Sequence, residues 1–211
     1  MSLKIKMKKE RDFEPIPEGT YPAICYTIAD IGMQYDEMRK KSSCQVIVIW
    51  EIADDDLRIE INEEMKRRAI NKWYTQSFSE KSNLYKDVRG WIGRDFTSEE
   101  LEGVFDLGSL IGTPCLIGVS NKIKDGKMQS KVTSVMQLPK GMKVEGPENP
   151  IVLYDMDESP KEELEKLPEW IQKLIEKSNE ANLKKANSIE VDIDPETGEV
   201  KGDLADMVET E

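Results

Sequence analysis

The segment from Lys66 to Gly93 changes from a strand pattern to a helix pattern almost without a loop, and this change constrains the fold more than any other feature. Ile70, Tyr74 and Phe78 share one parity, while Trp73 takes the other. Such alternation among β-branched and aromatic residues predicts a strand with two different faces. Directly afterwards, apolar residues recur at helical spacing. We therefore expect the central strand of a small β-barrel to run into a helix that caps the barrel.

The predicted helix has a start signal and a buried stripe. Ser79 is suited to begin it, because its side-chain oxygen can accept from the free N–H groups of the first turn. Leu84, Val88, Trp91 and Ile92 follow at helical spacing and are expected to face the core.

The strand also carries the residues expected to contact a nucleic acid. Arg67, Arg68 and Lys72 are predicted to meet phosphates, and Trp73 or Tyr74 offers a flat surface for an unstacked base. Burial in the core is the alternative for each aromatic residue, because large aromatic side chains dominate core packing.

The total charge argues against a polyanionic ligand, but its distribution reverses that inference. The chain has 211 residues and a net charge of -12. Residues 1–142 carry 22 basic and 22 acidic side chains, whereas residues 186–211 carry 1 and 9. A neutral body can still bind phosphates through local basic clusters, because counterion release depends on local contacts. These clusters are Lys4 to Arg11, Arg39 to Lys41, Lys66 to Lys72 and Lys122 to Lys131.

Two strands are predicted before this segment. Gly19 to Asp30 alternates, and Gly32 indicates a bulge or bend. Cys44 to Ile52 is apolar on both parities, which predicts burial on both sides. The polar stretch between them, Met33 to Ser43, is expected to be a loop that grips a single strand through Tyr35, Arg39, Lys40 and Lys41.

Two further strands are predicted after the helix. Pro114 to Asn121 and Gln129 to Leu138 flank Asp125-Gly126, a strong hairpin signal. Before them, Thr97 with Glu100 matches a capping box at the start of a short helix. The hairpin is the second loop expected to hold a single strand, through Lys122, Lys124 and Lys127.

This order of three strands, a helix and a two-strand hairpin is that of the oligonucleotide/oligosaccharide-binding (OB) fold. We therefore predict a mainly β protein with helices, built on a five-stranded OB barrel.

The barrel is expected to span residues 19–138. It follows a basic N-terminal arm at 1–18 that either contacts phosphates or is merely solvated. Residues 139–185 are expected to hold a connection and an amphipathic helix from Leu167 to Lys185, packed on the barrel or on a second subunit. Residues 186–211 are predicted to be a disordered acidic tail.

Several function classes are disfavoured. The chain contains no His, and its three cysteines are widely spaced, so we expect no metal and no cofactor. Asp54 to Asp56 is interpreted as a solvated loop in preference to a metal site. No catalytic constellation is present, so an enzyme is not expected. Cysteines in apolar runs, with no apolar stretch near 18 residues and no signal peptide, indicate a cytoplasmic protein without a membrane partner.

Several segments resemble a family of small bacteriophage and prophage replication-region proteins. They are WYTQSFSEKSNLYKDVRGWIGRDFTSEEL (Trp73 to Leu101), DLGSLIGTPCLIGV (Asp106 to Val119), VTSVMQLPKG (Val132 to Gly141), GTYPA (Gly19 to Ala23) and LPEWIQKLIEKSNE (Leu167 to Glu180). The resemblance implies a single-stranded-DNA-binding protein with an OB fold, acting in the cytoplasm of a bacterial host. It transfers no individual binding residue.

The acidic tail is similar to the C-termini of bacterial and phage single-stranded-DNA-binding proteins, which recruit replication partners and compete with DNA for the basic groove. Those tails commonly end in an aromatic or apolar tip, whereas this chain ends Val208, Glu209, Thr210, Glu211. The resemblance therefore implies phage or host replication and recombination proteins as partners, without docking by a terminal aromatic.

We accordingly expect a protein that coats single-stranded DNA during replication or recombination, with a homodimer as one possible state. The alternative is a replication or recombination adaptor that binds a protein partner through its barrel and its C-terminal helix.

Overall fold

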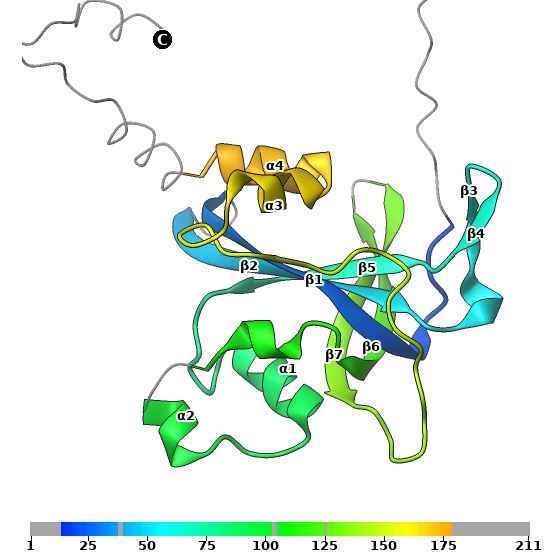
Figure 1. The fold of residues 1–211 in the computed structure, drawn as a ribbon, viewed down its shortest axis with the longest axis horizontal. Helices are drawn as coiled ribbons and strands as arrows, with labels where there is room; N and C mark the ends of the chain where they lie inside the picture. The colour runs from blue at the N-terminus through cyan, green and yellow to red at the C-terminus, as the bar shows by residue number, and fades with distance from the viewer. Residues whose placement is uncertain (1–13, 38–39, 103–104, 125, 179–211) are drawn as a thin grey trace, which may run out of the picture.

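The protein is built around one twisted sheet, seen in a computed structural model that describes residues 14–37, 40–102, 105–124 and 126–178 (Figure 1). Its five long strands lie in the order β5-β2-β1-β6-β7, and all neighbours in this path are antiparallel. A short sixth strand, β8, pairs with β1 in parallel. The strands are β1 (Gly19–Asp36), β2 (Lys41–Ile52), β5 (Ala69–Thr75), β6 (Pro114–Lys124), β7 (Lys127–Gln137) and β8 (Val152–Tyr154). A separate small hairpin consists of β3 (Ile59–Ile61) and β4 (Glu64–Lys66).

Helices cover both faces of the sheet. α1 (Asn83–Ile92) and α2 (Ser98–Glu102) lie on one side, and α3 (Lys161–Lys166) with α4 (Glu169–Glu176) lie on the other (Figure 1). Two short 3-10 turns are η1 (Asp55–Leu57) and η2 (Leu107–Leu110). Within the described residues, no helix is long and apolar enough to cross a membrane.

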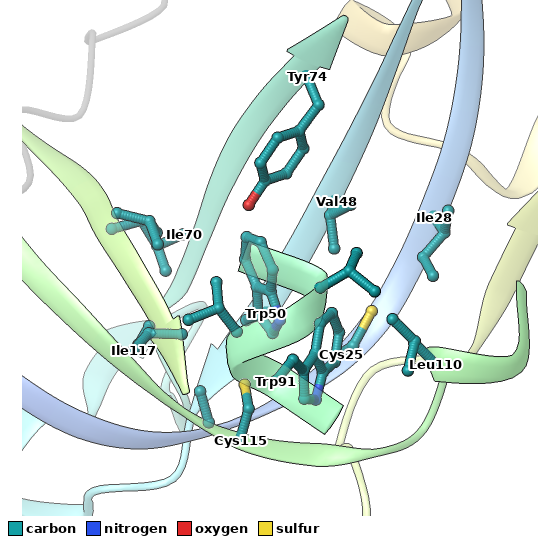
Figure 2. Packing of buried hydrophobic residues seen from close by; sticks show 14 of the residues in the cluster. Cys25, Ile28, Val48, Trp50, Ile70, Tyr74, Trp91, Leu110, Cys115 and Ile117 are labelled. Carbon is teal, nitrogen blue, oxygen red and sulfur yellow. The ribbon is translucent and has the colours of Figure 1, made fainter. Parts of the chain in front are cut away.

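β2 separates two hydrophobic cores, as its apolar residues on both parities predict. Every residue from 46 to 52 is buried. One face carries Trp50, which packs against Trp91 of α1 with ring centroids 5.7 Å apart (Figure 2). We call the cluster on this face, which contains both tryptophans, the inner core. The other face carries Ile47 and Ile49, which pack in one cluster with Ile171 of α4. We call this second cluster the outer core. The prediction of a strand buried on both sides is therefore confirmed.

Several local predictions are confirmed. The register of β1 against β2 shifts between Asp30 and Met33, where Gly32 has a φ of 65°. The backbone N–H of Thr97 donates to Glu100 Oε2 at 2.8 Å, while the N–H of Glu100 donates to Thr97 Oγ1 at 3.2 Å, which is a capping box. The buried stripe of α1 contains Leu84, Val88 and Trp91, whereas Ile92 is only partly buried.

The predicted five-stranded barrel is not closed. β5 and β7 are the two edges of the sheet and form no ladder with each other. Residues 14–16, which precede β1, connect the two edges by hydrogen bonds to β7 and to the residue before β5. The N–H of Ile16 donates to Ser130 Oγ of β7 at 2.8 Å, Asn121 donates to the carbonyl of Ile16 at 2.9 Å, and Arg68 donates to the carbonyl of Glu14. Ile16 is buried in the inner core, so residues 14–18 are part of the fold and residues 1–13 lie outside the described chain.

Other boundaries also differ from the predictions. The expected loop at 33–43 is mostly strand, because Met33 pairs with Cys44 and the ladder continues to Asp36 and Lys41. The cap of α1 is Ser82 instead of Ser79, since Ser82 Oγ accepts from the N–H of Tyr85 at 3.1 Å.

At the C-terminal end of the described chain, α4 begins where the predicted helix was expected to begin, and α3 is an additional helix before it that was not predicted. Leu167 is extended before Pro168, as the residue before a proline usually is, and this separates α3 from α4. α4 packs on the sheet as predicted, while residues 179–185 and the acidic tail at 186–211 lie outside the described chain.

Candidate nucleic-acid interface

A cleft of about 980 Å³ lies between the two edges of the sheet. Its walls come from β5 and the residues just before it, the β6–β7 hairpin, the β3–β4 hairpin and the segment at 14–16. Among its lining residues, all of which belong to the described chain, Glu14 is the one carboxylate. The basic lining residues are Lys66, Arg67, Arg68, Lys72, Lys124 and Lys131.

The free edge of β5 turns its backbone toward this cleft. The N–H of Ile52 donates to the carbonyl of Arg68 at 2.9 Å, which places the even-numbered residues of β5 in hydrogen-bonded positions toward β2. In an antiparallel strand, the intervening residues then direct their N–H and C=O groups away from that neighbour. Ala69, Asn71 and Trp73 therefore present backbone groups to the cleft, which their side chains also line.

Trp73 and Tyr74 are adjacent in the sequence but have opposite environments. Trp73 is 41% exposed and lines the cleft. Tyr74 is 3% exposed and lies among the inner core side chains, with Trp50 and Val48 (Figure 2). The predicted stacking role of Tyr74 is therefore wrong, because a base cannot reach its ring, and the alternative of core burial holds for this residue.

Tyr74 instead helps to hold Lys72. The hydroxyl of Tyr74 donates to Asp87 Oδ2 at 2.8 Å, and Lys72 Nζ lies 2.5 Å from the same oxygen and 5.3 Å from the centre of the Tyr74 ring. Burial, and then the Asp87 carboxylate, raise the pKa of Tyr74 well above its ordinary value. Lys72 thus faces the cleft with much of its charge already compensated.

Arg67 has a structural role. It is 9% exposed, and its guanidinium donates to the carbonyl of Gly146 at 2.9 Å while lying 3.8 Å from Glu51 and 3.6 Å from Glu148. Glu51 is completely buried and also accepts from the N–H of Asn149 at 2.6 Å. Because the guanidinium is enclosed by these acceptors, the predicted phosphate contact of Arg67 is not compatible with the structure.

Arg68 is partly exposed at the rim of the cleft, where it holds the carbonyl of Glu14. Burial lowers the pKa of its guanidinium. The guanidinium of Arg68 therefore holds the segment at 14–16 in place, and part of its side chain still faces solvent.

The β6–β7 hairpin carries four exposed lysines, of which two line the cleft. Lys122, Lys124 and Lys127 are exposed, and Lys124 lies directly opposite Lys127 at the end of the ladder. Lys124 lines the cleft, as does Lys131 further along β7. The structure therefore places this predicted loop beside β5, as the prediction of a gripping hairpin requires.

The β1–β2 hairpin lies apart from the cleft. Tyr35, 62% exposed, pairs in register with Ser42, and neither Tyr35, Lys40 nor Lys41 is among the residues that line the cleft. Arg39 lies outside the described residues. The amide of Gln34 donates to the carbonyl of Leu174 at 3.2 Å, so this hairpin lies against α4.

Two features of the cleft were missed by the sequence prediction. Lys66 and Lys131 lie in recognised basic clusters but were not selected as site residues, since clustering does not say which lysine faces a groove. Trp170 of α4 stacks on Trp73, with ring centroids 6.4 Å apart and planes inclined by 14°. The sequence contained a sign of this role, because Trp170 precedes Ile171 and so lies off the apolar stripe of Leu167, Ile171 and Ile175.

Comparisons with known proteins add no family to these observations. No family model matches this chain, and no curated protein matches it.

Proposed function

We propose that this protein binds single-stranded DNA in the cleft between β5 and β7, with little sequence preference. The observation that carries the proposal is the combination of an exposed tryptophan on a strand edge with lysines from a facing hairpin. Proteins that bind single strands without sequence preference combine a basic groove with aromatic side chains on which bases stack. Here Trp73 is the stacking residue, and Lys66, Lys124 and Lys131 are the cations that meet phosphates.

The strand arrangement supports an OB fold for this sheet. OB folds are five-stranded, partly open Greek-key barrels that bind oligonucleotides across one face and two loops. The order β5-β2-β1-β6-β7, with α1 between the third and the fourth long strand, fits that description. The resemblance to phage and prophage replication-region proteins points to the same class, and we place the protein's role in replication or recombination on this basis.

The adaptor hypothesis loses one of its two motivations. It is based on the neutral charge of residues 1–142 and on an apolar helix face available to a protein partner. Of the apolar residues of that face, Leu167, Ile171 and Ile175 are buried against the sheet within the chain itself, and Leu174 is half-buried. A protein partner would therefore have to use a different surface.

The test is fluorescence anisotropy with the full-length protein and a labelled 30-mer of oligo-dT, duplex DNA of the same length, or RNA. We expect the single strand to bind most tightly, and its affinity to fall steeply with salt, because phosphate contacts release counterions. Duplex DNA that binds as tightly as oligo-dT, or an affinity that is insensitive to salt, would refute the proposal. RNA that binds as well as DNA would broaden the ligand to single strands in general.

A further inference from the structure

Trp170 is exposed on a helix that has a well-packed opposite side. Its neighbour in the sequence, Ile171, is completely buried, and Ile175 is 3% exposed. Trp170 itself is 42% exposed. Since α4 is already anchored by these residues, Trp170 is not needed to fill the outer core.

The aromatic contact of Trp170 is with Trp73, a residue that lines the cleft. Its ring lies nearly parallel to that of Trp73, and Trp73 is itself a lining residue of the cleft and 41% exposed. Aromatic rings in offset stacks prefer centroid separations of about 4.5–7 Å, so the observed 6.4 Å is at the wide end of that range. The pair thus joins α4 to the end of β5 and leaves large ring surfaces open to solvent.

Positive charge continues from this pair along α4. Residues three and seven positions after Trp170 lie on the same side of a helix. These residues are Lys173 and Lys177, and both are exposed. This side of α4 therefore repeats the combination found in the cleft, which is an aromatic surface followed by cations at its edge.

We propose that the Trp73–Trp170 pair is a stacking site for a nucleobase and that a bound single strand leaves the cleft across this pair onto α4. The phosphates that follow this base then meet Lys173 and Lys177. The inference rests on the proposed function, and it extends the binding surface from the sheet to a helix outside it. It also predicts a longer bound segment than the cleft alone would hold.

Tryptophan emission provides a direct test. The chain has four tryptophans, and Trp50 and Trp91 are buried at 0% and 5% exposure. In the full-length Trp73→Phe variant, Trp170 is then the one exposed indole. We expect oligo-dT to quench its emission, because a stacked base quenches an indole that it contacts. Saturating binding without quenching in this variant would overturn the inference.

Affinity provides the second test. We expect Trp170→Ala to bind a 30-mer of oligo-dT about 5- to 100-fold more weakly, the loss typical of one stacked base. Trp170→Phe should recover most of that affinity, since it keeps an aromatic face. Leu101→Ala is the matched control, because Leu101 is an exposed apolar residue of α2 that does not line the cleft.

The outcomes separate this inference from the proposed function. If the wild-type protein does not bind oligo-dT, both fail. If the wild-type protein binds but Trp170→Ala binds equally well, the inference fails and the proposed function stands. Unchanged thermal unfolding of Trp170→Ala will show that a lost affinity does not arise from unfolding.

Discussion

The start of β5 and the β6–β7 hairpin both carry dense basic residues, but the structure uses these two clusters differently. Around β5, Arg67 is enclosed by Glu51 and Glu148, and Lys72 is held by Asp87. On the hairpin, Lys124 and Lys131 are exposed and line the same cleft. A cationic side chain that completes a buried ion pair contributes to folding, whereas an exposed one remains available for a ligand. Arg67 and Lys72 of the first cluster therefore contribute mainly to the fold, whereas the second cluster stays exposed and is the one that we propose for phosphate contacts.

The largest effect is expected from Arg67→Ala, which removes the cation from a buried carboxylate. Breaking a buried ion pair by removing one partner costs about 3–5 kcal/mol, because the remaining charge is left uncompensated. Urea denaturation should therefore show a free energy of unfolding lower by at least about 3 kcal/mol. A stable Arg67→Ala variant with weakened DNA binding would reverse the assignment of this residue.

The next effect is expected from replacing Lys122, Lys124 and Lys127 by Ala together. We expect affinity for oligo-dT to fall more than about 30-fold at low salt, with thermal stability unchanged. The slope of log affinity against log salt should become shallower by about 0.7 for each phosphate that the variant no longer neutralises.

The control for this variant is Lys140→Ala, Lys143→Ala and Lys161→Ala together, which changes the net charge equally at exposed sites outside the β6–β7 hairpin and outside the cleft. Equal losses of affinity in the two triple variants would mean that total charge, and not the hairpin, determines affinity.

Tyr74→Phe and Trp73→Ala sharpen the comparison within β5 itself. Tyr74→Phe removes a hydrogen bond to a carboxylate and should destabilise the protein by about 1–2 kcal/mol without changing DNA affinity. Trp73→Ala should leave stability nearly unchanged and weaken oligo-dT binding about 5-fold or more. Thermal unfolding and anisotropy, measured on both variants, will reveal whether the two effects separate. A loss of DNA affinity in Tyr74→Phe alone would contradict this division.

The smallest effect concerns the capping box of α2. The Arg94 guanidinium, followed by the N–H of Thr97, lowers the pKa of Glu100 from 4.5 to about 2. A carboxyl group whose pKa is lowered in the folded state stabilises the protein above its unfolded pKa and loses that contribution as pH falls through the folded value. Glu100→Gln should thus melt slightly below wild type at pH 7, and the difference should vanish as pH falls from about 4.5 to about 2. A constant difference across this range would exclude the charge of Glu100 as its cause.

Sequence patterns predicted best those segments whose environment stays the same from residue to residue. Residues 46–52 of β2 are all buried, and the capping box of Thr97 with Glu100 needs only residues of its own turn. β8 and α3 were missed because each is short. The three residues of β8 acquire their regular structure by pairing with the middle of β1, more than a hundred positions earlier in the chain. Met33 to Ser43 was missed for a different reason, because its polar composition concealed a ladder between two strands that are neighbours in the sequence.

The candidate site followed the same division. Residue type and spacing predicted three elements around one ligand, namely β5, the β1–β2 hairpin and the β6–β7 hairpin. β5 and the β6–β7 hairpin border the cleft, whereas the β1–β2 hairpin does not. They did not distinguish Trp73 from Tyr74, nor Arg67 from Lys124. Whether each side chain is enclosed or exposed depends on a partner elsewhere in the chain. Arg67 is enclosed by Glu51 of β2, and Tyr74 is held by Asp87 of α1.

The sequence by itself determined the periodicity of the long strands, the inner stripe of α1, the hairpin between β6 and β7 and the capping box of α2, because each depends on interactions within a few residues. The tertiary structure alone decided that β5 and β7 remain open edges, that a carboxylate in β2 captures Arg67, and that α4 brings Trp170 onto Trp73. The physical reason is that burial and charge compensation are properties of surfaces assembled from distant segments. A residue's own neighbours in the chain do not specify which of those surfaces it will meet.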